Sequence, residues 1–136
     1  MREANKLFEV VVFTASHQCY ADAVLDFLDP TRELVQHRLY REDCLLVNDV
    51  HVKDLRVLGD RNLDDIVIVD NAVHSFGYQL DNGIPLMSWH NDYADSQLLH
   101  LAEYLKVMHR YADVRDLNRA TFDLQRFYTE YRAMAK

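Results

Sequence analysis

The sequence of 136 residues has few glycines, prolines and cysteines, and it has no long apolar run. Its two cysteines, Cys19 and Cys44, cannot build a disulfide framework and are typical of reduced, packed thiols. Three glycines exclude a glycine-rich nucleotide cradle. The chain has no charged-then-apolar leader, and no apolar run approaches the roughly 20 residues of a membrane-spanning helix. We therefore predict a cytoplasmic or nuclear protein with no membrane partner.

Basic residues are scarce relative to acidic ones: 15 Lys and Arg stand against 22 Asp and Glu, and the formal net charge is −7. Because nucleic-acid affinity depends mainly on Lys and Arg that displace counterions, this balance argues against a nucleic-acid partner. A basic peptide suits the chain better. Apolar residues make up 49% of the sequence, which is enough for the core of one globular domain.

Predicted strands and predicted helices alternate along the chain, and this order predicts an α/β fold with a mostly parallel sheet. Strands are predicted at residues 8–13, 35–41, 44–47, 50–52, 66–69 and 84–89. The first and fifth of these segments are mostly apolar and do not alternate apolar with polar residues, which is typical of strands buried on both faces. The second, third and fourth are assigned to a small β insertion with a turn at Asn48-Asp49.

Helical spacing of apolar residues predicts three helices, over residues 20–28, 95–108 and 113–131. Ser16 is expected to cap the first of them and Asp113 the last. Residues 75–80 are expected to be either helical or irregular.

Polar residues stand where predicted strands end. Thr14 follows the first strand, Lys53 follows residues 50–52, and Asp70-Asn71 follow residues 66–69. Open α/β sheets bind ligands beyond the carboxyl ends of their strands, so these side chains are expected to meet there. Thr14 or Lys53 alone could be an ordinary surface residue, whereas adjacent polar groups after a buried strand are more specific. Together they predict a phosphate and magnesium site.

Several short motifs resemble those of the RNA polymerase II C-terminal-domain phosphatases, the small C-terminal-domain phosphatase, Dullard-like and NLI-interacting-factor-like family of the haloacid dehalogenase superfamily. The resemblance covers roughly residues 4 to 108. Its motifs are Phe13-Thr14-Ala15-Ser16, Tyr20-Ala21-Asp22, Tyr40-Arg41-Glu42-Asp43-Cys44, Val52-Lys53-Asp54-Leu55, Val69-Asp70-Asn71 and Asp81-Asn82-Gly83-Ile84-Pro85. It implies a three-layer α/β sandwich and a Mg²⁺-dependent phosphatase acting on phosphoserine or phosphothreonine proteins.

The resemblance also implies roles for the strand-end residues. Thr14 would donate its hydroxyl to the phosphate, and Lys53 would place a positive charge between the phosphate and the nucleophile. Asp70 and Asn71 would supply oxygen ligands to Mg²⁺.

Four further residues would hold the phosphopeptide, namely Ala15, Ser16, Tyr20 and Arg41. Tyr20 could instead belong to the core, and Arg41 could instead pair with Glu42 or Asp43.

The family's Asp-x-Asp-x-Thr motif, which ends its central first strand and carries the nucleophile, is not found in the sequence. Residues 1–111 are therefore predicted to form an incomplete catalytic domain that is inactive alone, followed by a helical extension at 112–136. A non-catalytic phosphopeptide-binding module is the alternative. With the central strand missing, residues 8–13 are expected either to pair directly with residues 66–69 or to leave a slot for another strand or chain. The family's Ser-Pro after Asp-Asn is Ala72-Val73 here.

Overall fold

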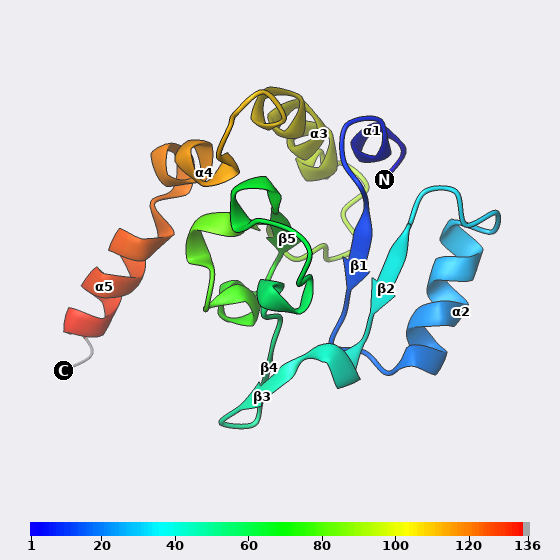
Figure 1. Ribbon diagram of the computed structural model, residues 1–136, viewed down its shortest axis with the longest axis horizontal. Helices are drawn as coiled ribbons and strands as arrows, with labels where there is room; N and C mark the ends of the chain where they lie inside the picture. The colour runs from blue at the N-terminus through cyan, green and yellow to red at the C-terminus, as the bar shows by residue number, and fades with distance from the viewer. Residues whose placement is uncertain (135–136) are drawn as a thin grey trace.

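The computed structural model describes residues 1–134 and shows an α/β arrangement without one continuous sheet (Figure 1). The strands found in this range form three sheets of two strands each. β1 (Val11–Phe13) pairs in parallel with β2 (His37–Leu39), and β5 (Ile68–Asp70) pairs in parallel with β6 (Gly83–Pro85). β3 (Leu45–Val47) and β4 (Val50–Val52) form an antiparallel hairpin.

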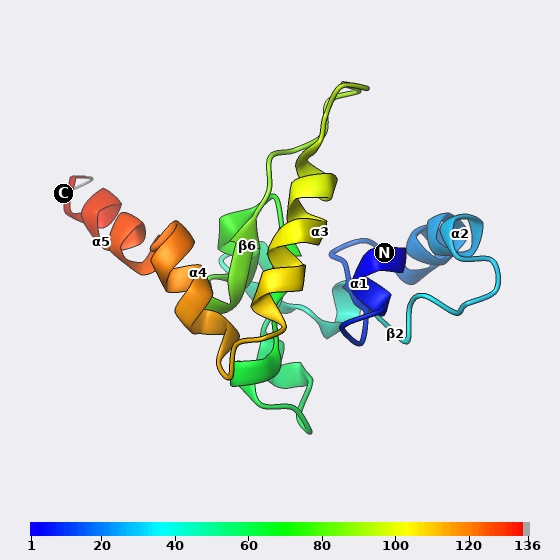
Figure 2. The same cartoon turned by 90° about the horizontal axis from the view of Figure 1, so that it is seen from above.

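Helices flank these sheets on several sides (Figures 1 and 2). Figure 2 shows α2 at one end of the molecule, α4 and α5 at the other, and α3 across the middle. The bounds are α1 (Arg2–Asn5), α2 (Gln18–Leu28), α3 (Gln97–Met108), α4 (Val114–Phe122) and α5 (Leu124–Met134). Short 3₁₀ helices lie at Arg41–Asp43, Leu55–Val57, Leu63–Asp65, Val73–Phe76 and Leu80–Asn82. Among the described helices, none is both long and apolar enough to cross a bilayer.

Apolar side chains on the two faces of the β5–β6 sheet form two buried clusters. One cluster contains Leu55, Ile66, Ile68, Phe76 and Leu80. The other joins Ile84 of β6 to α3 and α4 through Leu105, Met108 and Val114. The core therefore packs against the β5–β6 sheet and fixes the direction of the strand that ends at Asp70.

The turn before β6 depends on Asn82 and Gly83. The Asn82 amide is buried and donates hydrogen bonds to the carbonyls of Leu63 and Ile66, at 2.6 and 2.7 Å. A Cβ atom added to Gly83 would lie 2.0 Å from the Phe76 ring, so only glycine fits this close approach. These contacts tie the segment that enters β5 to the neighbouring strand.

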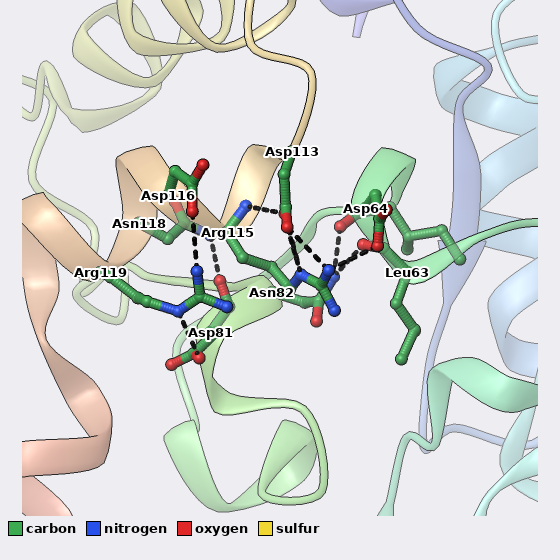
Figure 3. A network of polar contacts seen from close by, with 10 residues as sticks. Leu63, Asp64, Asp81, Asn82, Asp113, Arg115, Asp116, Asn118 and Arg119 are labelled. Atoms are coloured by element: carbon green, nitrogen blue, oxygen red, sulfur yellow. Dashed lines mark hydrogen bonds and ion pairs between the residues drawn. The ribbon is translucent and has the colours of Figure 1, made fainter.

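Polar contacts dock α4 onto the 3₁₀ helix that precedes β6 (Figure 3). The buried Asn118 amide donates to the carbonyl of Asp81 at 2.8 Å, and Tyr104 donates to the Asn118 oxygen at 3.0 Å. Asp113 caps the helix as the sequence predicts, because its carboxylate accepts a hydrogen bond from the Arg115 amide. The predicted division of the chain into a catalytic domain at 1–111 and a helical extension at 112–136 stays a prediction.

Several predicted elements differ from those observed. The segment predicted as a strand at 35–41 is not part of the insertion, since β2 joins β1 through the α2 crossover. Ser16 does not cap α2, whose N-cap is His17. The last predicted helix is two helices, because Asp123 adopts a left-handed conformation with φ of 44°. The strand predicted at 84–89 ends at Pro85.

β1 and β5 do not pair with each other in the described part of the chain. An apolar cavity of about 350 Å³ lies between them, and residues of both strands line it, including Val11, Phe13, Ile68 and Val69. The predicted direct pairing of residues 8–13 with 66–69 is therefore wrong, and the alternative of an open slot is observed. For the same reason β1 is only partly buried and Val69 of β5 is exposed, whereas the sequence predicts full burial of both strands.

Candidate functional site

The site lies where β5 ends. Asp70 is the last residue of β5, and its carbonyl accepts a hydrogen bond from the Leu86 amide at 3.0 Å. One oxygen of its carboxylate, Oδ1, accepts a hydrogen bond from the Ala72 amide at 2.8 Å. The chain turns here because this short bond closes a local loop of the kind that aspartate favours. Asp70 is thus held by both its backbone and its side chain.

Lys53 forms an ion pair with the other carboxylate oxygen of Asp70. The side chains of Lys53 and Asp70 are only 12% and 8% exposed, so the pair is well sheltered from water. Burial raises the pKa of Asp70, but hydrogen bonds from Lys53 and from the Ala72 amide lower it by more. The net pKa of Asp70 is lowered, and its carboxylate stays ionised at neutral pH.

Neighbouring groups hold the Lys53 loop against the loop that follows β5. The Lys53 amide donates a hydrogen bond to the carbonyl of Ser75 at 2.6 Å. Asp54, which is buried, accepts hydrogen bonds from the Arg56 amide and from the side-chain amide of Gln79. Gln79 in turn accepts a hydrogen bond from the Leu55 amide at 3.1 Å. This network fixes the backbone from which Lys53 reaches Asp70.

Thr14 lies at the end of β1, where its amide donates to the carbonyl of Leu39 of β2 at 2.9 Å. Its hydroxyl oxygen accepts a hydrogen bond from the Ser16 amide at 3.1 Å. The Cys44 thiol points toward the Thr14 carbonyl at 3.9 Å. Burial raises the pKa of that thiol, and the charge of Lys53 partly opposes this increase. Within residues 1–134 no hydrogen bond or ion pair joins Thr14 to Lys53 or Asp70, so the predicted meeting of these side chains stays a prediction.

Arg41 contacts the backbone of the loop that follows Thr14. Its Nε donates to the carbonyl of Ala15 at 2.7 Å, and its amide donates to the carbonyl of Ser16 at 3.1 Å. The alternative pairing with the acidic neighbours is not seen within residues 1–134. Glu42 instead pairs with His17, and Asp43 accepts from the Tyr40 amide. The guanidinium thus positions the loop.

Tyr20 lies on the first turns of α2 with 66% of its surface exposed. The alternative that places Tyr20 in the core is therefore wrong. Within the described residues, no hydrogen bond of its side chain ties it to Thr14, Lys53 or Asp70, so a role in substrate binding remains a prediction.

Several residues that shape the site were not predicted from the sequence. Asp54 could have been predicted, because it follows Lys53 directly in a matched motif and lies just after a strand. Gln79 lies in the segment left as helical or irregular and Ser88 in a predicted strand, and neither was singled out as a site residue, although Ser88 accepts a hydrogen bond from the Asn71 side-chain amide at 2.9 Å. Their roles depend on contacts between residues far apart in the sequence.

The oxygen atoms at the end of β5 suit a hard cation. Each carboxylate oxygen of Asp70 keeps a lone pair beyond its present hydrogen bond, and the Asn71 Nδ2 is occupied by Ser88, which leaves the Asn71 carbonyl oxygen available. No cluster of three or more His, Cys, Asp or Glu able to hold a metal occurs in the described range. Mg²⁺ commonly takes only one or two carboxylates and completes its shell with water and phosphate oxygens, so this set fits it.

Comparisons with known proteins agree with these observations. A sequence model of the family described as NLI interacting factor-like phosphatase matches residues 1–115. CTD small phosphatase-like protein 3 of Caenorhabditis elegans is 46% identical over 121 residues, covering 88% of this chain and 42% of that protein. CTD small phosphatase-like protein 2 of Dictyostelium discoideum is 41% identical over 130 residues, covering 96% of this chain and 23% of that protein. The chain spans less than half the length of these curated relatives.

A solved structure of Fcp1, an essential RNA polymerase II CTD phosphatase, has a similar arrangement with a TM-score of 0.55. Its sequence is 21% identical, and the match covers 88% of this chain and 35% of that chain. At this identity the likeness shows the fold alone. The fold is the α/β fold of the haloacid dehalogenase type, as the sequence predicts.

Proposed function

Because the chain belongs to the NLI interacting factor-like phosphatase family, we propose that it forms the phosphate- and magnesium-binding part of a protein serine/threonine phosphatase site. One observation carries this proposal: the sheltered ion pair between Lys53 and Asp70 at the carboxyl end of β5. A buried charge pair at such an edge is costly, and a ligand that uses both charges gives a reason for it.

Lys53 and Thr14 would bind the phosphoryl oxygens. The Lys53 ammonium has three donors and spends one on Asp70, so it can also donate to a phosphate. The Thr14 hydroxyl oxygen accepts from the Ser16 amide, which leaves its own proton free for the ligand. Ala15 and Ser16 belong to the loop that Arg41 holds, and we assign the Ala15 amide and the Ser16 hydroxyl to the phosphopeptide. Catalysis by such sites rests mainly on positioning and charge neutralisation.

Asp70 and Asn71 would hold Mg²⁺ through their side-chain oxygens. The cation, when bound, would neutralise charge on the phosphoryl group. Asp70 also keeps Lys53 oriented, so loss of its carboxylate removes a metal ligand and releases the ammonium together.

Turnover also needs a carboxylate that attacks phosphorus, and the resemblance assigns it to an Asp-x-Asp-x-Thr motif that this sequence lacks. We therefore expect this polypeptide alone to bind phosphate without hydrolysing it. We assign the cavity between β1 and β5 to a parallel strand from another segment or chain, whose carboxyl end would lie beside Lys53.

Binding of a phosphoserine peptide in the presence and absence of Mg²⁺ tests the proposal. Isothermal titration should give saturable binding that strengthens with Mg²⁺. With Mg²⁺ present, Asp70→Ala should weaken the binding by about tenfold or more, because a charge-assisted contact is worth about 1.5–3 kcal/mol. Asp65→Ala, a change at an exposed carboxylate in a 3₁₀ helix, is the matched control and should bind like the wild type.

The same samples are assayed with p-nitrophenyl phosphate. Negligible turnover is expected for the wild-type chain. A Mg²⁺-dependent rate that Asp70→Ala abolishes would show that the chain is catalytically complete and would contradict the expected inactivity. Equal peptide binding by wild type and Asp70→Ala would overturn the assignment of the site itself.

A further inference from the structure

A surface between β6 and α3 exposes large apolar side chains next to the proposed site. Met87, Trp89, Tyr93 and Leu98 are between 60% and 90% exposed. We call these four residues the Trp89 shelf. Exposed apolar side chains that gather in one place mark binding surfaces in soluble proteins. Figure 2 shows that the segment from β6 to α3 projects from the body of the molecule.

The Trp89 shelf is continuous with the proposed metal site. An open depression of about 530 Å³ is lined by Met87, Trp89 and Leu98 on one side and by Asp70 and Asn71 on the other. The hydrogen bond from Asn71 to Ser88, at 2.9 Å, joins the two parts directly. A ligand held at Asp70 could therefore extend along this depression to the shelf.

The aromatic rings of the shelf are held by local contacts. The Trp89 indole donates a hydrogen bond to the carbonyl of Asp92 at 3.0 Å. The Trp89 and Tyr93 rings meet edge to face, with centroids 6.3 Å apart and planes at 85°. The Met87 amide also donates to the Gln97 side chain at 2.9 Å. Because the rings are already positioned, a ligand would lose less entropy in ordering them.

The carboxylates near the shelf have no lysine or arginine beside them in the sequence, which contains neither residue from 62 to 105. Among residues 1–134, the charged side chains that line the two depressions beside the shelf are Asp70 and Asp95. Asp92 lies between Trp89 and Tyr93, and Asp95 lines a second depression of about 230 Å³ with Trp89. Neither carboxylate forms an ion pair within residues 1–134. Unpaired carboxylates and aromatic faces both attract cations.

We propose that the Trp89 shelf is a docking site for a basic segment of the phosphoprotein substrate, one that carries a leucine or isoleucine next to lysines or arginines. The apolar side chain would fill the depression beside Trp89, and the cations would lie against Asp92, Asp95 and the ring faces. This proposal rests on the proposed function, because it takes the segment to be part of the same peptide that presents its phosphate at Lys53.

The sequence provides its own reporter, since Trp89 is the single tryptophan. The probe is an unphosphorylated peptide of sequence Lys-Arg-Ile-Leu-Arg-Lys, which has no aromatic residue. Its titration should give a saturable change in Trp89 emission. Tyr93→Ala should weaken binding by about fivefold or more, in line with losing one exposed cation–π partner of about 1 kcal/mol. Tyr131→Ala removes another exposed tyrosine, on α5, and should leave the affinity unchanged.

Two further peptides are used. One tests whether binding depends on the positive charge of the probe, and the other tests whether the bound segment is part of the substrate. Replacing every Lys and Arg of the probe by Glu should abolish the emission change, and equal binding of this acidic peptide would overturn the proposal. Joining phosphoserine to the basic probe should give tighter binding than either part alone, because the second contact becomes intramolecular. If the joined peptide binds no more tightly than the stronger-binding of its two parts, the link to the substrate is overturned.

Failure of the two proposals can be told apart. If the basic probe changes Trp89 emission while phosphoserine peptide and inorganic phosphate do not bind, the proposed function is wrong and the shelf docks a basic partner of another kind. If phosphate binds but the probe leaves Trp89 emission unchanged, the docking proposal alone is wrong. Equal affinities of Tyr93→Ala and Tyr131→Ala would likewise overturn it.

Discussion

Lys53 shows how single contacts build the site. Its ammonium is paired with Asp70, and its backbone amide is bonded to Ser75. Removing one partner of a sheltered pair leaves an uncompensated charge, which costs about 3–5 kcal/mol when burial is complete. The network around Asp54 keeps the Lys53 backbone from moving away. We therefore expect the position of Lys53 to depend on the ionised state of Asp54 as well as of Asp70.

The carboxylate of Asp54 should make stability depend on acid pH. Hydrogen bonds from Arg56 lower the pKa of Asp54 from 3.8 to about 2, although burial opposes the change. Because the folded-state pKa is lower than the unfolded value, the stabilisation is complete above about pH 4 and is lost as the pH falls toward 2. Asp54→Asn should lower the free energy of unfolding at pH 7 by about 1–3 kcal/mol. The difference from wild type should shrink between pH 4 and pH 2.

Urea unfolding followed by circular dichroism at several pH values measures this effect. Asp65→Asn is the control, because Asp65 is exposed, and it should stay within about 0.5 kcal/mol of wild type throughout. A constant difference between Asp54→Asn and wild type from pH 7 to pH 2 would contradict the role assigned to the carboxylate.

Among the elements, α4 is held by contacts of very different strength (Figure 3). Asn118 is 2% exposed and satisfies both its donor to Asp81 and its acceptor for Tyr104. Arg119 pairs with Asp81 and Asp116 on the surface, where water weakens such pairs. The buried Asn118 amide should therefore contribute more to the docking of α4 than the exposed ion pairs of Arg119 do.

Substituting each residue by alanine tests this ranking. Asn118→Ala leaves the Asp81 carbonyl without its amide donor and opens a space where a buried side chain stood, so it should cost about 1–3 kcal/mol. Arg119→Ala should cost about 0–1 kcal/mol. Thermal unfolding of the two variants provides the comparison. An Arg119→Ala variant that is less stable than Asn118→Ala would contradict the inference.

The element predictions succeeded where the signal was local. The β3–β4 hairpin, with positive φ angles at both Asn48 and Asp49, follows from turn chemistry. The Asp113 cap follows from its position before an apolar pattern. The assignment of β2 failed because strand spacing says nothing about which strand is the partner. The break at Asp123 was missed because aspartate signals a left-handed residue far more weakly than glycine does.

In the whole molecule, the main feature is the apolar cavity between β1 and β5. Within residues 1–134 each of these strands has a partner on one edge only, so the other edge lacks sheet hydrogen bonds. Unpaired strand edges next to apolar surface favour added strands or aggregation. The net stability of a domain is only about 5–15 kcal/mol, so these unsatisfied groups should weaken the isolated chain considerably.

A strand supplied in trans should stabilise the chain. The probe is a peptide of about four valine and isoleucine residues followed by aspartate, with lysines added at its amino end for solubility. At a concentration ten times its dissociation constant, it should add about 1.4 kcal/mol and raise the melting temperature by roughly 5 °C. Circular dichroism melts measure the shift. A peptide with proline at its centre is the control and should have no effect, because it lacks a ladder donor.

A chain that melts cooperatively at high temperature as a monomer, with no response to the valine-rich peptide, would contradict the cost assigned to the open edges. Size-exclusion chromatography of the same samples shows whether the chain is monomeric. An equal response to the proline peptide would show that the cavity binds apolar chains without adding a strand.

The sequence alone determined which residues end the strands at the site and which family they resemble. Those features are local, because a buried run and the polar residue after it are adjacent in the chain. Only the tertiary structure decided that β1 and β5 stay apart, that Arg41 contacts the Ala15 carbonyl, and that the Trp89 shelf adjoins Asp70. These depend on contacts between distant segments, whose free energies depend on how the whole chain packs and not on the spacing of any one motif.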